Sequence, residues 1–348
     1  MTENNFNIIR LFAAIQVIFR HLFYGANFDN VYISYIYKFI MFFPGVPIFF
    51  TISGFLIFWS YDKNANLKVY FFNRFLRIYP GLWVCLFFTV IILIIADRQG
   101  QISNNLSVFL LWIAAQLTIV QFWTPDFLKF WGEGTPNGSL WTIFIEIQFY
   151  FFIPFFYFLL KKLGKYKIFF IFILSTFSIL FNNYISSFEK ESIIHKLGFV
   201  CLFTYLFYFL SGIIIYLYWD KLKTIIFDKS LFWFFSYFIL CFFMWNNDTD
   251  LNNYYINHPL KILFSIVLSL LVISLAFSFR EISSILIGKT DISYGIYIYH
   301  MIIINFFHQN DLLKNDIESY IILFFVIIIV TFLSWFLIEK PSLKYKLR

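Results

Sequence analysis

The stretch SYIILFFVIIIVTFLSWFLI, residues 319–338, decides the fold class of this 348-residue chain. It holds no charged side chain, and a helix of about 20 residues rises about 30 Å, the thickness of the hydrocarbon core of a bilayer. The whole chain shares this character, since 61% of its residues are hydrophobic and 13% are charged. A soluble domain has about 45–50% apolar and about 25% charged residues. The chain is therefore expected to be an all-α, polytopic integral membrane protein.

Ten apolar stretches of this kind run along the sequence, and each is expected to form a transmembrane helix. They are residues 6–24, 39–60, 78–96, 140–160, 167–184, 197–219, 230–245, 259–279, 292–309 and 319–338. A further apolar stretch, 106–122, is interpreted as interfacial or re-entrant. No internal repeat and no soluble extension is apparent, so residues 1–348 are expected to form a single membrane domain.

The basic residues predict the orientation of these spans. With ten spans and a cytoplasmic N-terminus, 17 of the 26 Lys and Arg residues fall on inner loops and 7 on outer loops, while Arg10 and Arg20 lie inside the first span. An eleventh span at 106–122 would place the lysine cluster at 161–167 outside. Because cytoplasmic loops carry an excess of Lys and Arg, the sequence predicts ten spans with both termini in the cytoplasm. The net charge of +7 then reflects topology, and no nucleic-acid partner is expected.

The cysteines and the N-terminus exclude other classes of protein. Cys85, Cys201 and Cys241 lie inside apolar runs without CxxC or histidine-rich spacing, so neither a disulfide framework nor a metal site is expected. No basic cluster precedes the first apolar stretch, so the first span is expected to remain in the protein.

The first span carries two ionisable residues, Arg10 and His21, on one predicted helical face. Eleven residues correspond to three turns and roughly 20°, which places the two side chains about 16 Å apart along the helix. They can anchor the two edges of the span. Alternatively, His21 can take a proton from a hydroxyl near neutral pH, with Arg10 meeting an anionic cofactor from the cytosol. The spacing leaves both readings open.

Two further segments place polar side chains at or inside a span. In FFNRFLRIYPGLW, residues 71–83, Arg74 and Arg77 share a helical face and suit either phosphate groups or anionic lipid. In GSLWTIFIEIQFYFFIP, residues 138–154, Glu146 can either orient a histidine or pair with an arginine. His300 ends a tyrosine-lined face of the ninth span, and we interpret it as a core histidine.

The order of these segments resembles the acyltransferase-3 family of integral membrane acyltransferases. The motifs are Arg10 followed by His21, GVPIFFTISGFLI at 45–57, Arg74 and Arg77 with IYPGLW at 78–83, LWTIFIEIQFY at 140–150, SYGIYIYH at 293–300 and SWFLIEKP at 334–341. Pro47 stands where many members have Asp, so no role is carried to that position. Thr142 and Ile143 replace a Ser and a Leu of the family motif.

The resemblance implies an O-acyltransferase of the bacterial inner membrane. Such an enzyme moves an acyl group, most often acetyl, from cytoplasmic acyl-CoA to a sugar hydroxyl of a surface polysaccharide or of its lipid-linked precursor. By the same resemblance His21 is catalytic, Glu146 occupies an acidic motif position in the catalytic site, Arg10 supports donor handling, and Arg74 and Arg77 contact the CoA phosphates. Acetyl-CoA is the expected donor, and the C-terminal hydrolase-like domain of some relatives is not expected here.

Two questions stay open from the sequence. His21 can act as a general base or can take the acyl group covalently. A transporter or lipid flippase is the alternative function, although transporters commonly show related halves with broken helices, and no such halves are found. The outer segment 97–139, which contains Trp123, Trp131 and Glu133, is the expected place for acceptor choice. The sequence predicts no oligomeric state.

Overall fold

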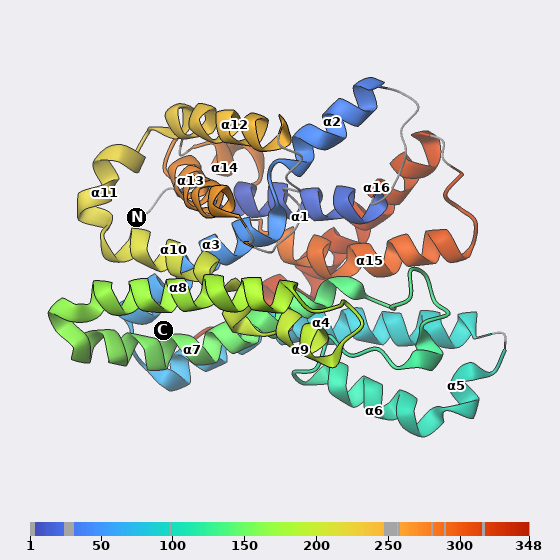
Figure 1. Cartoon of the computed structure of the whole chain (residues 1–348). Helices are drawn as coiled ribbons and strands as arrows, with labels where there is room; N and C mark the ends of the chain where they lie inside the picture. The colour runs from blue at the N-terminus through green and yellow to red at the C-terminus, as the bar shows by residue number, and fades with distance from the viewer. Residues whose placement is uncertain are drawn as a thin grey trace. The chain divides into compact units, whose positions relative to one another are not determined.

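The computed structural model describes residues 4–23, 31–97, 99–246, 256, 258–279, 281–288, 290–314 and 317–347 (Figure 1). Every regular element in these residues is a helix, which confirms the all-α prediction. The helices form two compact units, each built from two separate stretches of chain. Unit 1 contains Met1–Ala65 and Gln148–Asp291, and unit 2 contains Asn66–Ile147 and Ile292–Arg348.

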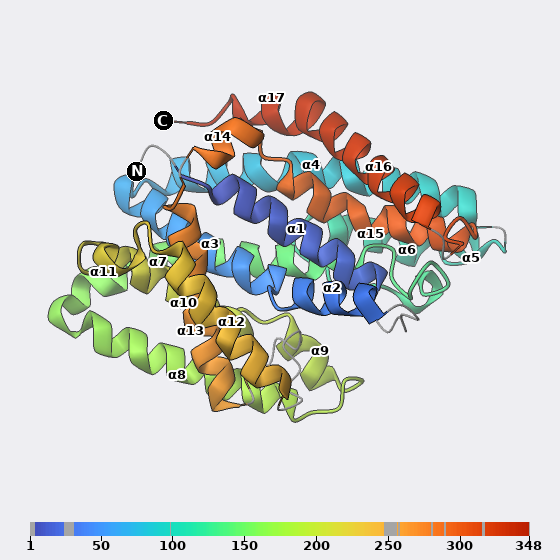
Figure 2. The ribbon, with the colours of Figure 1, turned by 90° about the horizontal axis from the view of Figure 1, so that it is seen from above.

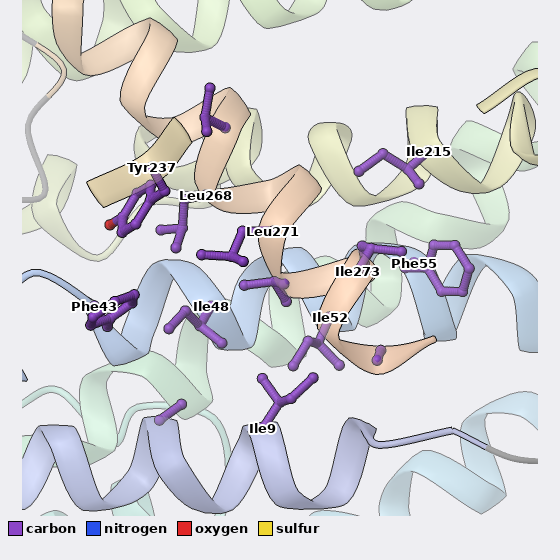
Figure 3. Close-up of a cluster of buried hydrophobic side chains, with 14 of the residues drawn as sticks. Ile9, Phe43, Ile48, Ile52, Phe55, Ile215, Tyr237, Leu268, Leu271 and Ile273 are labelled. Atoms are coloured by element: carbon purple, nitrogen blue, oxygen red, sulfur yellow. The ribbon is translucent and has the colours of Figure 1, made fainter. Parts of the chain in front are cut away.

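Unit 1 is built around a core of aliphatic and aromatic side chains (Figure 3). Its helices are α1 (Phe6–Leu22), α2 (Val31–Met41), α3 (Gly45–Lys63), the second part of α7 (Trp141–Leu163), α8 (Lys167–Ser186), α9 (Ile193–Phe199), α10 (Leu202–Leu217), α11 (Trp219–Ile226), α12 (Ser230–Asn246), α13 (Pro259–Ala276) and α14 (Ile282–Leu286). Ile9 of α1, Ile52 of α3 and Leu271 of α13 meet in this core, so three helices far apart in sequence support one another.

Helices α3 and α10 pack backbone to backbone at two glycines. A Cβ atom on Gly54 would lie 2.1 Å from the Phe209 carbonyl oxygen, and one on Gly212 would lie 2.1 Å from the Thr51 carbonyl oxygen. Small residues at such crossings let helices in a membrane approach closely and gain van der Waals contact. The Phe50 and Phe209 rings stack beside the crossing with centroids 4.6 Å apart.

Two buried amides hold α1 in place. Asn5 donates from Nδ2 to the Ser278 and Phe279 carbonyl oxygens at 2.7 and 2.9 Å, and its Oδ1 accepts from the Ser283 amide at 2.9 Å. Further along α1, Gln16 Oε1 accepts from the Gly45 amide at the start of α3, at 2.8 Å. These bonds satisfy backbone groups that lie beyond the ends of α13 and at the first turn of α3, where no helical partner exists.

Unit 2 is built around α15 (Ser293–Gln309), which packs against α16 (Ile317–Ser334) and α4 (Leu67–Ala96) (Figure 2). The remaining elements are α5 (Gln101–Asn104), α6 (Leu106–Leu117), two short 3₁₀ turns at Asp126–Leu128 and Gly138–Leu140, the first part of α7, a π-helical turn η4 at Trp335–Glu339, and α17 (Lys340–Leu343). The π turn lies directly between α16 and α17, and it carries part of the SWFLIEKP motif.

Each of the ten predicted spans overlaps one long helix: α1, α3, α4, α7, α8, α10, α12, α13, α15 or α16. In the described part of the chain, six helical segments are long and apolar enough to cross a membrane, or seven if the bent pair α11 and α12 forms one span. One of the six, Gly138–Ser186, contains both α7 and α8, while α1 and α15, with 17 residues each, are not among them. The count of ten spans and the orientation therefore stay predictions.

The structure differs from the predicted boundaries at two places. The stretch 39–60 is interrupted, because α2 ends at Met41 and α3 begins at Gly45, directly after Pro44, which has no backbone N–H to donate. Helix α4 begins at Leu67, so Arg74 and Arg77 lie well inside it. Helix α6, by contrast, agrees with the interpretation of 106–122 as interfacial or re-entrant, because its 12 residues rise only about 18 Å, too little to span a bilayer alone. Residue 24, the end of the first predicted span, lies outside the described residues.

Candidate active site

The predicted site residues divide between the two units. Arg10 and His21 belong to unit 1, whereas Arg74, Arg77 and Glu146 belong to unit 2. The structure places Arg10 and His21 on one helix of unit 1 and relates Arg77 and Glu146 to the same tyrosine of unit 2, and the joint site of all five remains a prediction.

Arg10 and His21 lie on the packed face of α1. Ala14 and Val17, which are within about 40° of Arg10 around the helix, are 0% and 3% exposed. Phe12, on the opposite side of α1, is 43% exposed. Both side chains are themselves partly exposed, and the functional reading of Arg10 and His21 remains a prediction beside the anchoring one.

Arg10 forms an ion pair with a residue that the sequence analysis did not single out. Its Nη1 lies 3.5 Å from Oδ2 of Asp291, and the two side chains are 23% and 11% exposed. Asp291 lies two residues before α15, at the boundary of unit 1, and Asn5 ties Ser278 and Ser283 to the start of α1. The carboxylate therefore limits where the Arg10 guanidinium can point, since the segments that carry both residues are held together.

The two arginines of α4 each lie over an aromatic ring. The Arg74 guanidinium carbon is 5.8 Å from the centroid of the Tyr70 ring, and that of Arg77 is 5.7 Å from the centroid of the Tyr294 ring. Both arginines are partly exposed. A guanidinium held over a ring keeps its N–H donors in its own plane, where anionic oxygens can approach them. This arrangement suits phosphate groups.

Tyr294 joins the Arg77 motif to the last motif of the chain. Its hydroxyl donates to the Ile78 carbonyl oxygen at 2.7 Å. Oε1 of the buried Glu339, in the π turn, accepts from Ser334 Oγ at 3.0 Å. A Cβ atom on Gly295 would lie 3.0 Å from Glu339 Oε1, so a glycine at that position makes room for this carboxylate.

Glu146 lies near the same tyrosine. The charges of Glu146, Arg77 and Glu339 are all close enough to the Tyr294 hydroxyl to interact with it electrostatically. Glu146 is partly exposed on α7 rather than fully buried. Unit 2 therefore gathers one of the predicted arginines and the predicted acid around Tyr294.

The start of α7 is tied to α15 by hydroxyl groups. Thr142 Oγ1 bonds the Tyr297 hydroxyl at 2.6 Å, and Ser139 Oγ donates to the Tyr297 carbonyl oxygen at 3.1 Å. Thr142 stands where the family motif has a serine, and its hydroxyl group is hydrogen-bonded to Tyr297. His300 on the same helix is fully buried, and its Nδ1 is 3.1 Å from the Ile296 carbonyl oxygen, which confirms the core reading.

Asp291, Tyr294 and Glu339 are the residues of these clusters whose role the sequence analysis missed. All three lie at or within the two closing motifs, so their motif positions were the available signal. No group of three or more His, Cys, Asp and Glu residues that suits a metal ion occurs among the described residues.

Comparison with known proteins gives one consistent picture. The family model described as an acyltransferase domain matches residues 3–340. Nodulation protein 10 of Rhizobium leguminosarum bv. viciae is 27% identical, over 99% of this chain and 94% of the relative. The peptidoglycan O-acetyltransferase of Listeria monocytogenes is 28% identical over 45% of this chain, which corresponds to 24% of the relative. An acyltransferase of Streptomyces mycarofaciens is 30% identical over 34% of this chain and 29% of its own length. No solved structure matches significantly.

Proposed function

Since the chain belongs to the acyltransferase-3 family and is therefore an O-acyltransferase, we propose that it moves an acetyl group from cytoplasmic acetyl-CoA to a sugar hydroxyl of a surface polysaccharide or of its lipid-linked precursor. The resemblance drawn from the six sequence motifs is confirmed by the family match. The peptidoglycan O-acetyltransferase among the relatives supports an acetyl donor and a glycan acceptor.

The observation that carries this proposal is the placement of Arg10 and His21 on the packed face of one helix. In the reaction, the acceptor oxygen bonds to the thioester carbonyl carbon, the bond from that carbon to sulfur breaks, and the acceptor proton ends on the CoA thiol. A histidine can carry this proton near neutral pH, and we assign that role to His21. Acyl transfer through His21 itself is the alternative course, which trapping of an acyl-enzyme would reveal.

Three arginines would bind the donor. Arg74 and Arg77 suit the CoA phosphates because they share a helix face and each guanidinium lies over a ring. Arg10, held by Asp291, would contribute a further positive charge to donor handling. Glu146 is proposed as the acid of the catalytic site, in a position from which its charge also acts on Tyr294.

We further propose that the two units act as one domain in the inner membrane, with ten spans and both termini in the cytoplasm. The family match runs across both units, which supports a single domain. The ten long helices that overlap the predicted spans support the count, and the excess of Lys and Arg on the inner loops supports the orientation.

The test of the chemistry is the pair His21→Ala and His21→Gln in purified protein. Release of the CoA thiol from acetyl-CoA in the presence of a panel of sugars should fall to background in both variants, while the unfolding temperature is retained. His308→Ala, which removes an exposed histidine at the end of α15, is the matched control and should keep full activity. A fully active His21→Ala enzyme would overturn the assignment.

The test of the donor site is Arg74→Ala and Arg77→Ala, with acetyl-CoA affinity measured by calorimetry. Both variants should bind more weakly than wild type, and Lys68→Ala, an exposed basic residue on the same helix, should not. Indifference of the wild-type protein to CoA would favour a transporter instead.

A further inference from the structure

Unit 2 contains a small polar pocket that the proposed chemistry does not use. It lies between α4, α6 and the segment that leads from α6 to α7. Its polar walls are the side chains of Thr89, Gln116, Gln121, Thr124, Thr135 and Asn137, and the apolar remainder includes Leu86, Trp112 and Leu140. The pocket has space for about one water-sized group, and six uncharged polar side chains surround it. Such a polar cluster is unusual in so apolar a chain.

One wall of the pocket is a turn held by glutamine side chains. Gln121 donates from Nε2 to the carbonyl oxygens of Thr118 and Gln116, at 2.7 and 3.2 Å. Gln116 donates from its own Nε2 to the Trp123 carbonyl oxygen at 3.0 Å, and Trp112 Nε1 donates to the same oxygen at 3.1 Å. These hydrogen bonds hold the segment after α6, up to residue 124, against the end of that helix. This side of the pocket is therefore largely pre-formed.

The opposite wall is anchored to α15. Asn305, which is fully buried, donates from Nδ2 to the carbonyl oxygens of Thr135 and Pro136, at 2.8 and 3.1 Å. Asn137 donates in the same way to the Ile298 carbonyl oxygen at 2.8 Å. Gly132 allows Asn305 to approach, since a Cβ atom there would lie 2.2 Å from Asn305 Cγ. Both walls are thus fixed by buried or partly buried side-chain hydrogen bonds.

The pocket presents one acceptor and one donor to a ligand. Gln121 is 3% exposed, and its Oε1 accepts no hydrogen bond from any residue that the structure describes. The Thr124 and Thr135 hydroxyl oxygens are 3.0 Å apart, so one hydroxyl donates to the other and the second keeps its hydrogen for another acceptor. An alcohol hydroxyl both donates and accepts, so it matches this pair of groups.

The absence of charge among the lining residues narrows the ligand class. A phosphate or carboxylate in such a pocket would lose its hydration without gaining a cation. A neutral hydroxyl has a much smaller desolvation penalty, and here it gains two hydrogen bonds. The space admits one such group rather than a whole ring, so the rest of the ligand must lie outside it.

We propose that this pocket is a specificity site that binds one hydroxyl of the acceptor sugar, a hydroxyl other than the one that is acylated. The inference rests on the proposed function, because only a sugar acceptor gives the pocket a reason to recognise a hydroxyl. Gln121 Oε1 accepts the hydrogen of that hydroxyl, and the Thr124 and Thr135 pair donates to its oxygen. The pocket thereby selects acceptors that carry a hydroxyl at one ring position.

The experiment follows the logic of a double-mutant cycle: it combines a change in the protein with the removal of one hydroxyl from the sugar. Wild-type enzyme and the double variant Thr124→Val, Thr135→Val are assayed with acetyl-CoA on methyl glycosides and on their monodeoxy analogues. For wild type, one monodeoxy analogue should lose about tenfold in kcat/KM while still being acetylated elsewhere. The double variant should lose up to about tenfold on the parent glycoside. Its further loss on that analogue should be clearly smaller than the loss in wild type, because the bond from the threonine pair is already missing and only the bond to Gln121 is left to lose.

Three controls separate the loss of this hydrogen bond from other effects of the substitutions. Thr176→Val removes an exposed hydroxyl from α8, which contributes no residue to the pocket, and should leave every kcat/KM unchanged. Thr124→Ser keeps a hydroxyl and should restore the wild-type pattern, which separates hydrogen bonding from packing. The affinity of each variant for acetyl-CoA should equal that of wild type, since the pocket does not serve the donor.

The failures of the two proposals differ. If wild type transfers acetyl to the glycosides, yet the same analogue loses as much in the double variant as in wild type, the pocket holds only a buried water and the inference is wrong. If wild type acetylates no glycoside, the proposed function fails. Saturation-transfer NMR of the methyl glycosides then tests the pocket separately. A glycoside signal that is present with wild type and lost with the double variant supports the pocket proposal, and absence of a signal with wild type overturns it.

Discussion

The Arg10 guanidinium lies 3.5 Å from the Asp291 carboxylate, although 281 residues separate the two in sequence. Both side chains retain some exposure to solvent, so screening limits the pair to about 0–1 kcal/mol of stability. The larger effect of the ion pair is on the orientation of Arg10, because the Asp291 carboxylate favours one position of this long side chain. A donor-binding arginine that is already oriented loses less conformational freedom when the donor arrives.

Asp291→Asn tests that effect of orientation. The KM for acetyl-CoA should rise severalfold, while the unfolding free energy changes by no more than about 1 kcal/mol, because the pair is partly exposed. Steady-state kinetics and thermal unfolding in detergent measure the two quantities. Glu281→Gln, which neutralises an exposed carboxylate just before α14, should change neither. A large loss of stability with unchanged KM would show that Asp291 serves the fold instead.

Tyr294→Phe and Tyr294→Leu separate the ring of Tyr294 from its hydroxyl. Phenylalanine keeps a ring face under Arg77, whereas leucine removes it. If the ring orients Arg77 for the donor, the leucine variant should bind acetyl-CoA about two- to thirtyfold more weakly than the phenylalanine variant, the range expected for a cation–π contact. Calorimetric titration of both variants checks this ratio. Equal affinities would mean that the ring has no part in donor binding.

Asn5→Ala should be one of the more destabilising polar substitutions in unit 1. The side chain is 4% exposed and makes three hydrogen bonds to backbone groups of Ser278, Phe279 and Ser283. At about 1 kcal/mol for each bond, and with buried groups left unpaired, the loss should reach about 2–4 kcal/mol. Asn66→Ala, which removes an exposed cap of α4, should lose only about 1 kcal/mol. Thermal unfolding distinguishes the two, and equal losses would contradict the account.

Gly54→Ala and Gly212→Ala should each disrupt the contact between α3 and α10. The added Cβ atom would lie 2.1 Å from a carbonyl oxygen of the partner helix, so the backbones must separate. Overpacking of this kind lowers the unfolding free energy by about 1–3 kcal/mol or more. Gly164→Asn is the control, because it places a side chain at a positive φ that Asn tolerates, with no atom within 4 Å of the new Cβ. Its unfolding temperature should stay close to that of wild type.

The helices could be predicted well because their signals are local. A stretch of about twenty apolar residues identifies a helix wherever it occurs, and all ten stretches overlap long helices. The boundaries were less accurate where local chemistry is ambiguous. Pro44 interrupts an apolar run that reads as continuous, and the polar start of α4 at Leu67 resembles a loop.

The contacts of the site could be predicted only in part. The pairing of Arg74 with Arg77 follows from helical spacing, and so does the shared face of Arg10 and His21. The partner of Arg10 could not be predicted, since nothing near Arg10 in sequence points to Asp291. The place of Glu339 depends on Ser334 and Gly295, and Gly295 reaches it only through tertiary packing. Long-range polar contacts leave no periodic pattern in a sequence.

The hydrogen bonds of Asn5 also have a consequence for how the protein is made. The oxygen that Asn5 contacts at 2.7 Å belongs to Ser278, 273 residues later in the chain. At a synthesis rate of about 5–20 residues per second, the ribosome needs about 14–55 s to supply that partner. During this interval the first helix is inserted before the Ser278 carbonyl group that Asn5 contacts and the Asp291 carboxylate that Arg10 contacts have been synthesised. The folding of unit 1 is thus completed late, and a nascent chain stalled before residue 278 should present α1 to chaperones or proteases of the membrane.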